Sequence, residues 1–169
     1  MAGAKGTRIV QAARVQIGDV YRADYISLTY PNGDVPRGTG ACTDVVIRAL
    51  RGVGVDLQSR VHTDMKANFA SYPRRWGLRR PDPNIDHRRV PNLQTFWRRQ
   101  GAAMSGGTWL PGDVVTWMLP NGRDHCGIIS DTRGSSGQPT VIHNLSRCAE
   151  EDCLYTWRIT GHYRYPRGL

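Results

Sequence analysis

The sequence predicts an α+β fold in which N-terminal helices pack on an antiparallel β-meander. Up to Gly101, several segments place apolar residues at helical spacing. From Pro111 onward, the pattern changes to short apolar and β-branched runs that turn-forming residues separate. Helices followed by strands joined through short turns are typical of α+β proteins.

Four helices are predicted before the strands. In each of the first two, the apolar residues share one helical face, and glycines follow the second helix. A basic loop with four prolines, residues 72–92, lies before the last one. The predicted helices span residues 5–17, 42–51, 60–72 and 92–101.

The strands are predicted to follow one another as neighbours in one sheet. Pro120-Asn121-Gly122 is a turn sequence that would join the first two strands as a hairpin. The expected strands span residues 112–119, 125–131, 140–145 and 153–165. At 169 residues the chain fits one domain. We interpret residues 1–169 as a single catalytic domain in which residues 60–103 form a basic, Pro-containing insertion.

The chain is strongly basic, with 23 Lys and Arg against 14 Asp and Glu and a net charge of +9. Such a charge attracts polyanions, including nucleic acid, anionic envelope polymers and acidic proteins. Four arginine pairs carry part of it, at positions 74–75, 79–80, 88–89 and 98–99. A solvated surface, an anionic envelope polymer and an acidic partner are the three explanations for these pairs.

No apolar run approaches the roughly 18 residues that a membrane span needs. The N-terminal segment lacks the continuous apolar core of a secretory signal. We therefore expect either that a signal was removed or that the protein leaves its cell by a route that needs none.

The four cysteines lie at positions 42, 126, 148 and 153, without a CxxC pair, which argues against a zinc ribbon or a thioredoxin-type motif. Cys148 and Cys153 flank a short acidic segment. A disulfide that closes this segment is one interpretation, and it would require an oxidising compartment. Two unpaired, half-buried thiols are the other.

Cys42 is the candidate nucleophile because a helix begins there. Unpaired N–H groups at a helix N-terminus lower the pKa of a thiol and could also hold an oxyanion. Gly38 and Gly40 allow a sharp turn just before it. Asp44 lies in the first helical turn, where its negative charge interacts favourably with the helix dipole but opposes formation of the Cys42 thiolate. The simpler interpretation is a small buried residue on an ordinary helix.

Two histidines on consecutive strands favour the chemical interpretation. His125 opens one predicted strand, and His143 lies in the next, where antiparallel pairing would bring the two side chains together. A cysteine, an imidazole and a polar group that orients the imidazole make up a catalytic triad.

The order of these elements resembles that of the NlpC-type cell-wall cysteine peptidases of the papain-like superfamily. The shared motifs are a Cys that opens a helix, a Gly-Asp before a strand, His-x-Gly-Ile at the next strand, and a later His. Here they match Cys42, Gly112-Asp113, His125–Ile128 and His143. More closely, residues 25–165 resemble a bacterial domain-of-unknown-function family within that superfamily. The matching segments are YPNGDVP, CTDVVIRALR, YPRRWGL, PDPNIDHRRVPNLQ, GDVVTW, HCGIISD, IHN and GHYRY.

The resemblance implies a papain-like fold with Cys42 as nucleophile, His125 as base and His143 as the third member. Asn144 is an alternative third member, since only one of two adjacent strand residues can face His125. At position 126 this chain has a cysteine, where members of the family commonly have an apolar residue. Strand alternation points it away from the face of His125, so no catalytic role is expected.

Further candidates lie in loops. Tyr30 and Asp34, together with Asp44, are the predicted substrate-binding residues, although Asn-Gly-Asp at 32–34 is also an ordinary turn sequence. His87 is expected to form structural hydrogen bonds. His62 and His162 lack metal-ligand spacing, and we predict neither a metal nor an organic cofactor.

These inferences predict a monomeric peptidoglycan amidase or endopeptidase that cuts stem peptides in the bacterial envelope or periplasm. A secreted antibacterial effector, delivered for instance by a type VI system, is one hypothesis, and its immunity protein would carry an acidic surface. The alternatives are a basic nucleic-acid-binding protein or nuclease, a non-catalytic wall-binding module, and a thiol protease or acyltransferase that acts on a host protein. Because the aromatic residues are not interleaved with the arginine pairs, no nucleic-acid partner is expected.

Overall fold

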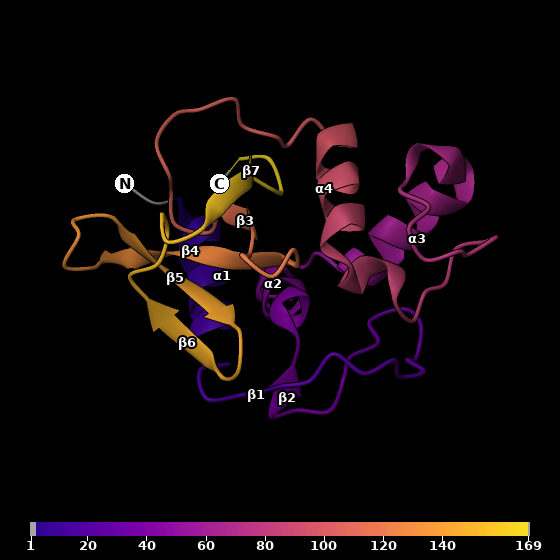
Figure 1. Cartoon of the computed structure of the whole chain (residues 1–169), viewed down its shortest axis with the longest axis horizontal. Helices are drawn as coiled ribbons and strands as arrows, with labels where there is room; N and C mark the ends of the chain where they lie inside the picture. The colour runs from indigo at the N-terminus through magenta and orange to yellow at the C-terminus, as the bar shows by residue number, and fades with distance from the viewer. Residues whose placement is uncertain (1–2, 169) are drawn as a thin grey trace.

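Five antiparallel strands form the sheet at the centre of the protein (Figure 1). The structure is a computed structural model that describes residues 3–168. The strand order in the sheet is β6-β5-β4-β3-β7, so consecutive strands pair from β3 to β6 and β7 returns to the far side of β3. The strands are β3 (Val114–Met118), β4 (Asp124–Arg133), β5 (Pro139–Asn144), β6 (Cys148–Glu151) and β7 (Arg158–Tyr163).

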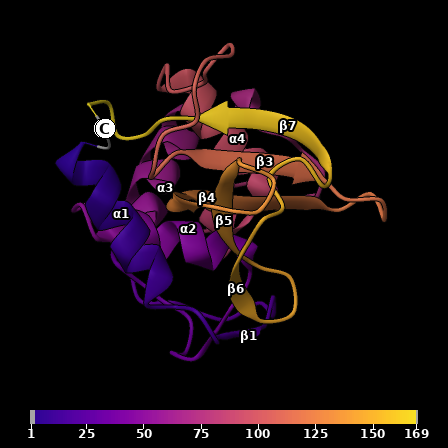
Figure 2. The same ribbon diagram turned by 90° about the vertical axis from the view of Figure 1, so that its left-hand side faces the viewer.

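The helices precede the sheet in sequence, and α1 and α2 lie together against one of its faces (Figure 2). The four α-helices are α1 (Ala4–Arg14), α2 (Cys42–Arg51), α3 (Leu57–Asn68) and α4 (Val90–Arg99). Two-residue strands β1 (Val20–Tyr21) and β2 (Thr39–Gly40) pair in parallel just before α2. The α+β prediction, with helices on an antiparallel meander, is confirmed.

Both faces of the sheet are buried, which explains why its central strands are continuous apolar runs. Towards the helices, Ile128 and Ile142 join one core with apolar residues of all four helices. On the opposite face, Trp117, Ile129 and Val141 form a second core. The segment after β6 covers this second core with Leu154 and Trp157. Adjacent residues of one strand therefore serve different cores.

The segment interpreted as an insertion packs on the main core. Phe96 and Trp97 of α4 are almost fully buried and belong to the core that α1 and α2 form with the sheet. Figure 1 shows α3 lying farther from the sheet than α4. Residues 69–89 connect them and contain two short 3-10 turns, at 69–71 and 86–88.

Several predicted bounds differ from the structure, and one strand was not predicted. The first helix ends at Arg14, and Ile17, predicted to face the core, is 46 % exposed because the chain turns at Gly18 with φ of 101°. β6 was not predicted, because its sequence CAEE lacks the β-branched residues typical of strands. The last strand begins at Arg158 rather than Cys153, because residues 153–157 form a turn.

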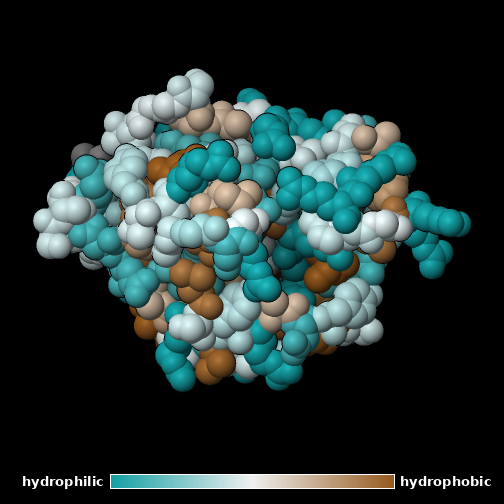
Figure 3. Space-filling model, in the orientation of Figure 1, coloured by the Kyte–Doolittle hydropathy of each residue, from teal (hydrophilic) through white to brown (hydrophobic). Residues whose placement is uncertain are grey.

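Hydrophobic residues on the face shown in Figure 3 lie in small groups between hydrophilic ones. Within residues 3–168, no helix has the length and apolar character that crossing a membrane requires. All four cysteines are free thiols, so of the two interpretations of Cys148 and Cys153 the structure has the unpaired thiols, both of them buried.

Candidate active site

Cys42 is the first residue of α2, as the sequence predicts. Its side chain is 7 % exposed and lines a groove of about 300 Å³. The N–H groups of the first helical turn have no partner within the helix, and with the helix dipole they favour a negative charge there. Cys42 therefore lies at the groove, at the electropositive end of the helix.

Asp44 fixes the turn that leads into α2. Its carboxylate accepts a hydrogen bond of 2.7 Å from the Ala41 N–H and two of 3.0 Å from the Arg88 guanidinium. Arg88 thus compensates the negative charge that would otherwise oppose the Cys42 thiolate. The Asp44 side chain is 3 % exposed and does not line the groove, so the structure gives Asp44 a structural contact in place of the expected position beside a substrate.

His125 lies at the start of β4, directly opposite Trp117 of β3. Its ring stacks on the Trp117 indole with 5.3 Å between centroids, and the edge of Trp157 packs against it. Its Nε2 lies 2.8 Å from Nδ1 of His143. These contacts hold the imidazole in one orientation and leave Nδ1 as its other polar atom.

Cys126 and His125 are the side chains that lower the pKa of the Cys42 thiol. The hydrogen bond from the Cys126 thiol lowers the pKa of Cys42 well below its usual range, while burial opposes ionisation. His125 lowers the pKa of Cys42 further through a second hydrogen bond and its positive charge. The site thus favours a thiolate at Cys42.

Cys126 does point away from the face of His125, as strand alternation predicts, but this orientation places it against α2. Its side chain is fully buried in the helix-side core that also contains Cys42. The hydrogen bond to Cys42, followed by burial, raises the pKa of Cys126 well above its usual range. It therefore stays a neutral donor to the Cys42 sulfur. Strand alternation predicts the direction of the Cys126 side chain but not the residue that it meets there.

Of the two candidates for the third member, only His143 contacts His125. The Asn144 amide instead donates to the main-chain oxygens of Gly40 and Asp19, at 3.2 and 3.1 Å, and holds the loops before α2. Gly127, the glycine of the His-x-Gly-Ile motif, pairs with His143. A Cβ on Gly127 would lie 2.6 Å from Val141 and 3.1 Å from the His143 Cβ, so only glycine lets β5 approach this closely.

Sequence reasoning missed Glu151, the last residue of β6. Its Oε2 lies 2.6 Å from Nε2 of His143, and the Cys153 sulfur lies 3.6 Å from the same nitrogen. Burial lowers the pKa of His143 and raises that of Cys153 to about 12, so both are neutral near pH 7. No sequence signal marks Glu151, because its position depends on the pairing of an unpredicted strand.

His143, Glu151 and Cys153 also form a set of side chains whose metal-binding atoms lie within 4.8 Å of one another. Two ligands of one tetrahedral zinc ion, however, lie roughly 3.3 Å apart. The 2.6 Å between His143 Nε2 and Glu151 Oε2 is a hydrogen-bond distance. The set is thus arranged as a hydrogen-bonded pair with a thiol beside it.

The groove beside Cys42 is basic. Arg75 donates to Asp124 at 3.3 Å, and the Arg89 guanidinium lies over the Trp76 ring, 4.2 Å from its centroid. Arg123 is exposed at the β3–β4 turn. The charged residues that line the groove are Arg75, Arg88, Arg89, Arg123 and Asp124. Asp44 compensates Arg88, and Asp124 pairs with Arg75, so the positive charges of Arg89 and Arg123 remain to favour an anionic ligand.

Tyr30 and Asp34 do not line this groove. Asp34 accepts two 3.0 Å hydrogen bonds from Arg48, whose guanidinium is buried and needs that partner. Tyr30 packs edge-on against His62, 5.3 Å between centroids, beside a different hollow. The loop before Cys42 thus has a structural role, because Asp34 compensates a buried arginine rather than facing the nucleophile.

The remaining candidates also lie away from the groove. His87 is 2 % exposed, and burial lowers its pKa to about 3. Its Nδ1 has no hydrogen-bond partner within the described chain, which contradicts the expected structural hydrogen bonds. The arginine pairs do not form one solvated face, because Arg88 is buried with Asp44 and Arg99 binds Asp64 at 2.7 Å.

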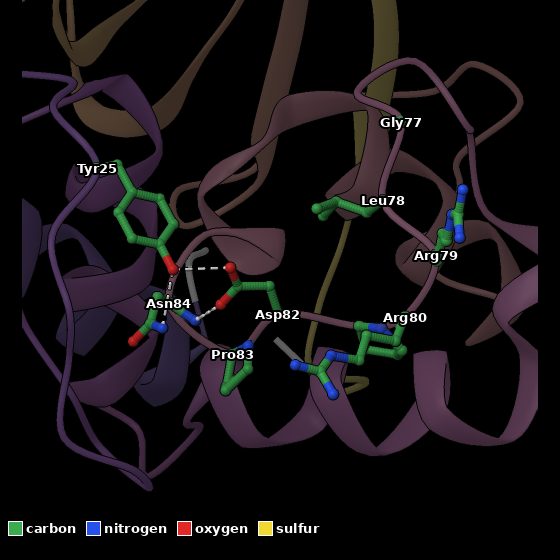
Figure 4. Close-up of a pocket in the computed structure, with 9 residues that line it drawn as sticks. Tyr25, Gly77, Leu78, Arg79, Arg80, Asp82, Pro83 and Asn84 are labelled. Atoms are coloured by element: carbon green, nitrogen blue, oxygen red, sulfur yellow. Dashed lines mark hydrogen bonds between the residues drawn. The ribbon is translucent and has the colours of Figure 1, made fainter.

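A larger hollow, of about 950 Å³, lies in the 77–84 loop (Figure 4). The Tyr25 hydroxyl donates to Asp82 at 2.8 Å, and the Asn84 amide donates to that hydroxyl at 3.1 Å. Arg79 and Arg80 lie at its other side. None of its lining residues is a cysteine or histidine, so it offers no thiol nucleophile and no imidazole base.

Comparison with known proteins agrees with this geometry. The family described as a domain of unknown function, DUF1287, matches residues 10–165. A protein of Escherichia coli K12, described as uncharacterized protein YijF, is 52 % identical over 164 residues, which cover 93 % of this chain and 80 % of YijF.

Two solved structures share the fold. NlpC1 from Trichomonas vaginalis superposes with a TM-score of 0.53 at 14 % identity, and NlpC2 from the same organism with 0.51 at 16 %. Each match covers 98 % of this chain but only 46 % and 49 % of the respective NlpC chains. The NlpC-type, papain-like fold is confirmed.

Proposed function

Since the chain belongs to the DUF1287 family and has the papain-like fold of the NlpC proteins, we propose that it is a cysteine hydrolase that cleaves amide bonds. One observation carries the proposal. Cys42 opens a helix at a surface groove, and His125, which is hydrogen-bonded to His143, lowers the pKa of its thiol together with Cys126.

In this proposal the Cys42 thiolate attacks the carbonyl carbon of the substrate, and the resulting oxyanion accepts hydrogen bonds from N–H groups at the start of α2. The C–N bond then breaks as the protonated His125 gives its proton to the leaving amine. A thioester remains on Cys42. His125 next removes a proton from water, the hydroxide attacks the thioester, and the carboxylic acid leaves as the thiolate is restored.

We infer that the substrate is a peptide or amide bond in peptidoglycan stem peptides. The resemblance to cell-wall peptidases supports this inference, and so does the groove, because stem peptides carry carboxylates that its arginines suit. An antibacterial effector whose immunity protein is acidic is a further hypothesis. It predicts that the protein lyses cells when exported to the periplasm and does not when kept in the cytoplasm.

Intact sacculi provide the direct test. The purified protein should release muropeptides whose masses, measured by mass spectrometry, identify the bond that is cut. Cys42→Ala should reduce release by at least about a thousandfold, since the nucleophile is lost. Cys148→Ala, which removes another buried thiol outside the groove, is the matched control and should retain activity. Equal release by wild type and Cys42→Ala would refute the proposal.

A further inference from the structure

Glu151 extends the hydrogen-bonded chain of the site beyond its three predicted members. It lies across from Val141, so its side chain is on the same face of the sheet as His143, two residues along β5. The Glu151 side chain is 55 % exposed, whereas that of His143 is 2 % exposed. An acidic group in contact with water thus touches the buried end of the imidazole pair.

The carboxylate determines where the protons of both imidazoles lie. A carboxylate only accepts hydrogen bonds, so the 2.6 Å contact requires a proton on Nε2 of His143. A neutral imidazole has one N–H, and Nδ1 of His143 must then accept. Across the 2.8 Å contact, Nε2 of His125 is therefore the donor.

The consequence reaches Cys42. With its proton on Nε2, neutral His125 presents the unprotonated Nδ1 as its remaining ring nitrogen, and this atom can take the thiol proton of Cys42. If the chain of hydrogen bonds ran in the opposite direction, Nδ1 of His125 would already carry a proton. His125 could not then act as the base.

We propose that Glu151 is a positioning residue that orders the tautomers of His143 and His125 and stabilises the imidazolium that forms when Cys42 loses its proton. The proposal rests on the hydrolase function above. Cys153 does not replace Glu151, because its buried thiol is neutral and lies 3.6 Å from His143. Glu151 is thus the negative charge in contact with the imidazole pair.

The first test uses a readout that needs no substrate. The rate at which iodoacetamide alkylates Cys42 is measured against pH for wild type and Glu151→Gln, with the other three cysteines replaced by alanine or serine in both. Loss of the carboxylate should shift the alkylation midpoint to higher pH, because the imidazolium that pairs with the thiolate is less stable. Asp152→Asn, which removes the neighbouring exposed carboxylate, should leave the midpoint unchanged.

The second test uses muropeptide release with native cysteines and a chelator present, so that metal bound at His143 or Cys153 contributes nothing. Glu151→Gln should lower kcat by about 10- to 100-fold with little change in KM. Glu151→Asp should recover part of the loss, because it restores the charge. A wild-type midpoint and wild-type kcat for Glu151→Gln would overturn the proposal.

The two tests also separate this proposal from the proposed function. If wild type releases nothing from sacculi but Glu151→Gln still shifts the alkylation midpoint, the hydrolase function fails and the positioning role of Glu151 stands. If wild type is active and Glu151→Gln matches it in both tests, the hydrolase function stands and the positioning role of Glu151 fails.

Discussion

Two histidine–carboxylate pairs lie on the same sheet, and they differ in what surrounds the acid. On β7, Nε2 of His162 donates to Asp113 at 2.7 Å, and on β5, Nε2 of His143 donates to Glu151 at 2.6 Å. The distances are nearly equal. The hydrogen bond alone therefore does not separate a structural pair from a catalytic one.

Asp113 is completely buried and saturated with donors. Arg164 donates two hydrogen bonds of 2.8 Å to it, the Leu110 N–H donates a third, and the His162 ring stacks on Trp109. Burial opposes its ionisation, but the hydrogen bonds from Arg164 and His162 lower the pKa of Asp113 overall. This pair ties β7 to the start of β3, so its role is structural.

Glu151 is exposed, and the imidazole it holds leads through a second imidazole to a thiol at a helix N-terminus. In the proposed function, the two pairs differ in the group at their other end, which for His143 is a second imidazole and for His162 is not. The following predictions test that difference.

The largest effect should be the difference in muropeptide release between two variants, His125→Gln in the proposed catalytic site and His162→Gln in the structural pair. His125→Gln should reduce muropeptide release by about a thousandfold, because it removes the base, and should lower the free energy of unfolding by about 1–2 kcal/mol, because it removes a buried hydrogen bond to His143. His162→Gln should keep kcat within about twofold and lower the unfolding free energy by about 1–2 kcal/mol. Urea denaturation and activity per folded molecule measure both, and a similar kcat for the two variants would abolish the distinction.

The next effect concerns the buried acid. Asp113→Asn should lower the free energy of unfolding by about 2–3 kcal/mol, because it removes the charge that Arg164 and His162 both bond. Activity per folded molecule should stay near that of wild type. Urea titration monitored by tryptophan fluorescence checks the first expectation, and unchanged stability would show that the pair is dispensable.

The same pair predicts an acid dependence with a definite sign. Because the folded pKa of Asp113 lies below its ordinary value of 3.8, its stabilisation is fully present above about pH 4 and lost as the pH falls further. The pKa of Glu150 is lowered in the same way. Burial opposes its ionisation, but hydrogen bonds from Arg14 and three hydroxyl groups lower the pKa to about 2. Wild type should thus lose stability between about pH 4.5 and 2, and Asp113→Asn should lose less over that range.

The smallest effect should come from Cys126. Cys126→Ala removes the thiol donor to the Cys42 sulfur, so the pKa of Cys42 should rise by about one unit and its thiolate fraction below that pKa fall about tenfold. Alkylation of Cys42 against pH measures this shift. Cys126→Ser, which restores a donor, should recover part of it. An unchanged midpoint in Cys126→Ala would assign the activation to His125 and the helix alone.

Local patterns in the sequence predicted much of this fold. Helical periodicity and the glycines around it place the start of α2 at Cys42, and the turn at 120–122 places His125 at the head of β4. Consecutive antiparallel strands then bring His143 to His125. Each of these inferences depends on residues close together in the chain, where periodicity and turn chemistry are informative.

The roles of other residues were decided by contacts between distant segments. Asp34 lies in a turn sequence that suits a groove, yet it compensates Arg48, which α2 buries. Cys126 joins the core that contains Cys42 because β4 packs against α2. Glu151 reaches His143 only through the pairing of β5 with β6, a strand with no propensity signal.

The sequence by itself therefore determined the α+β order, the helix that begins at the candidate nucleophile, and the two histidines beside it. Only the tertiary structure decided which Asp and Glu side chains are available to the candidate active site. A carboxylate is available to a catalytic site only if no buried arginine needs its charge. That need arises from packing between segments far apart in the chain, as with Asp34 and Arg48 or Asp113 and Arg164.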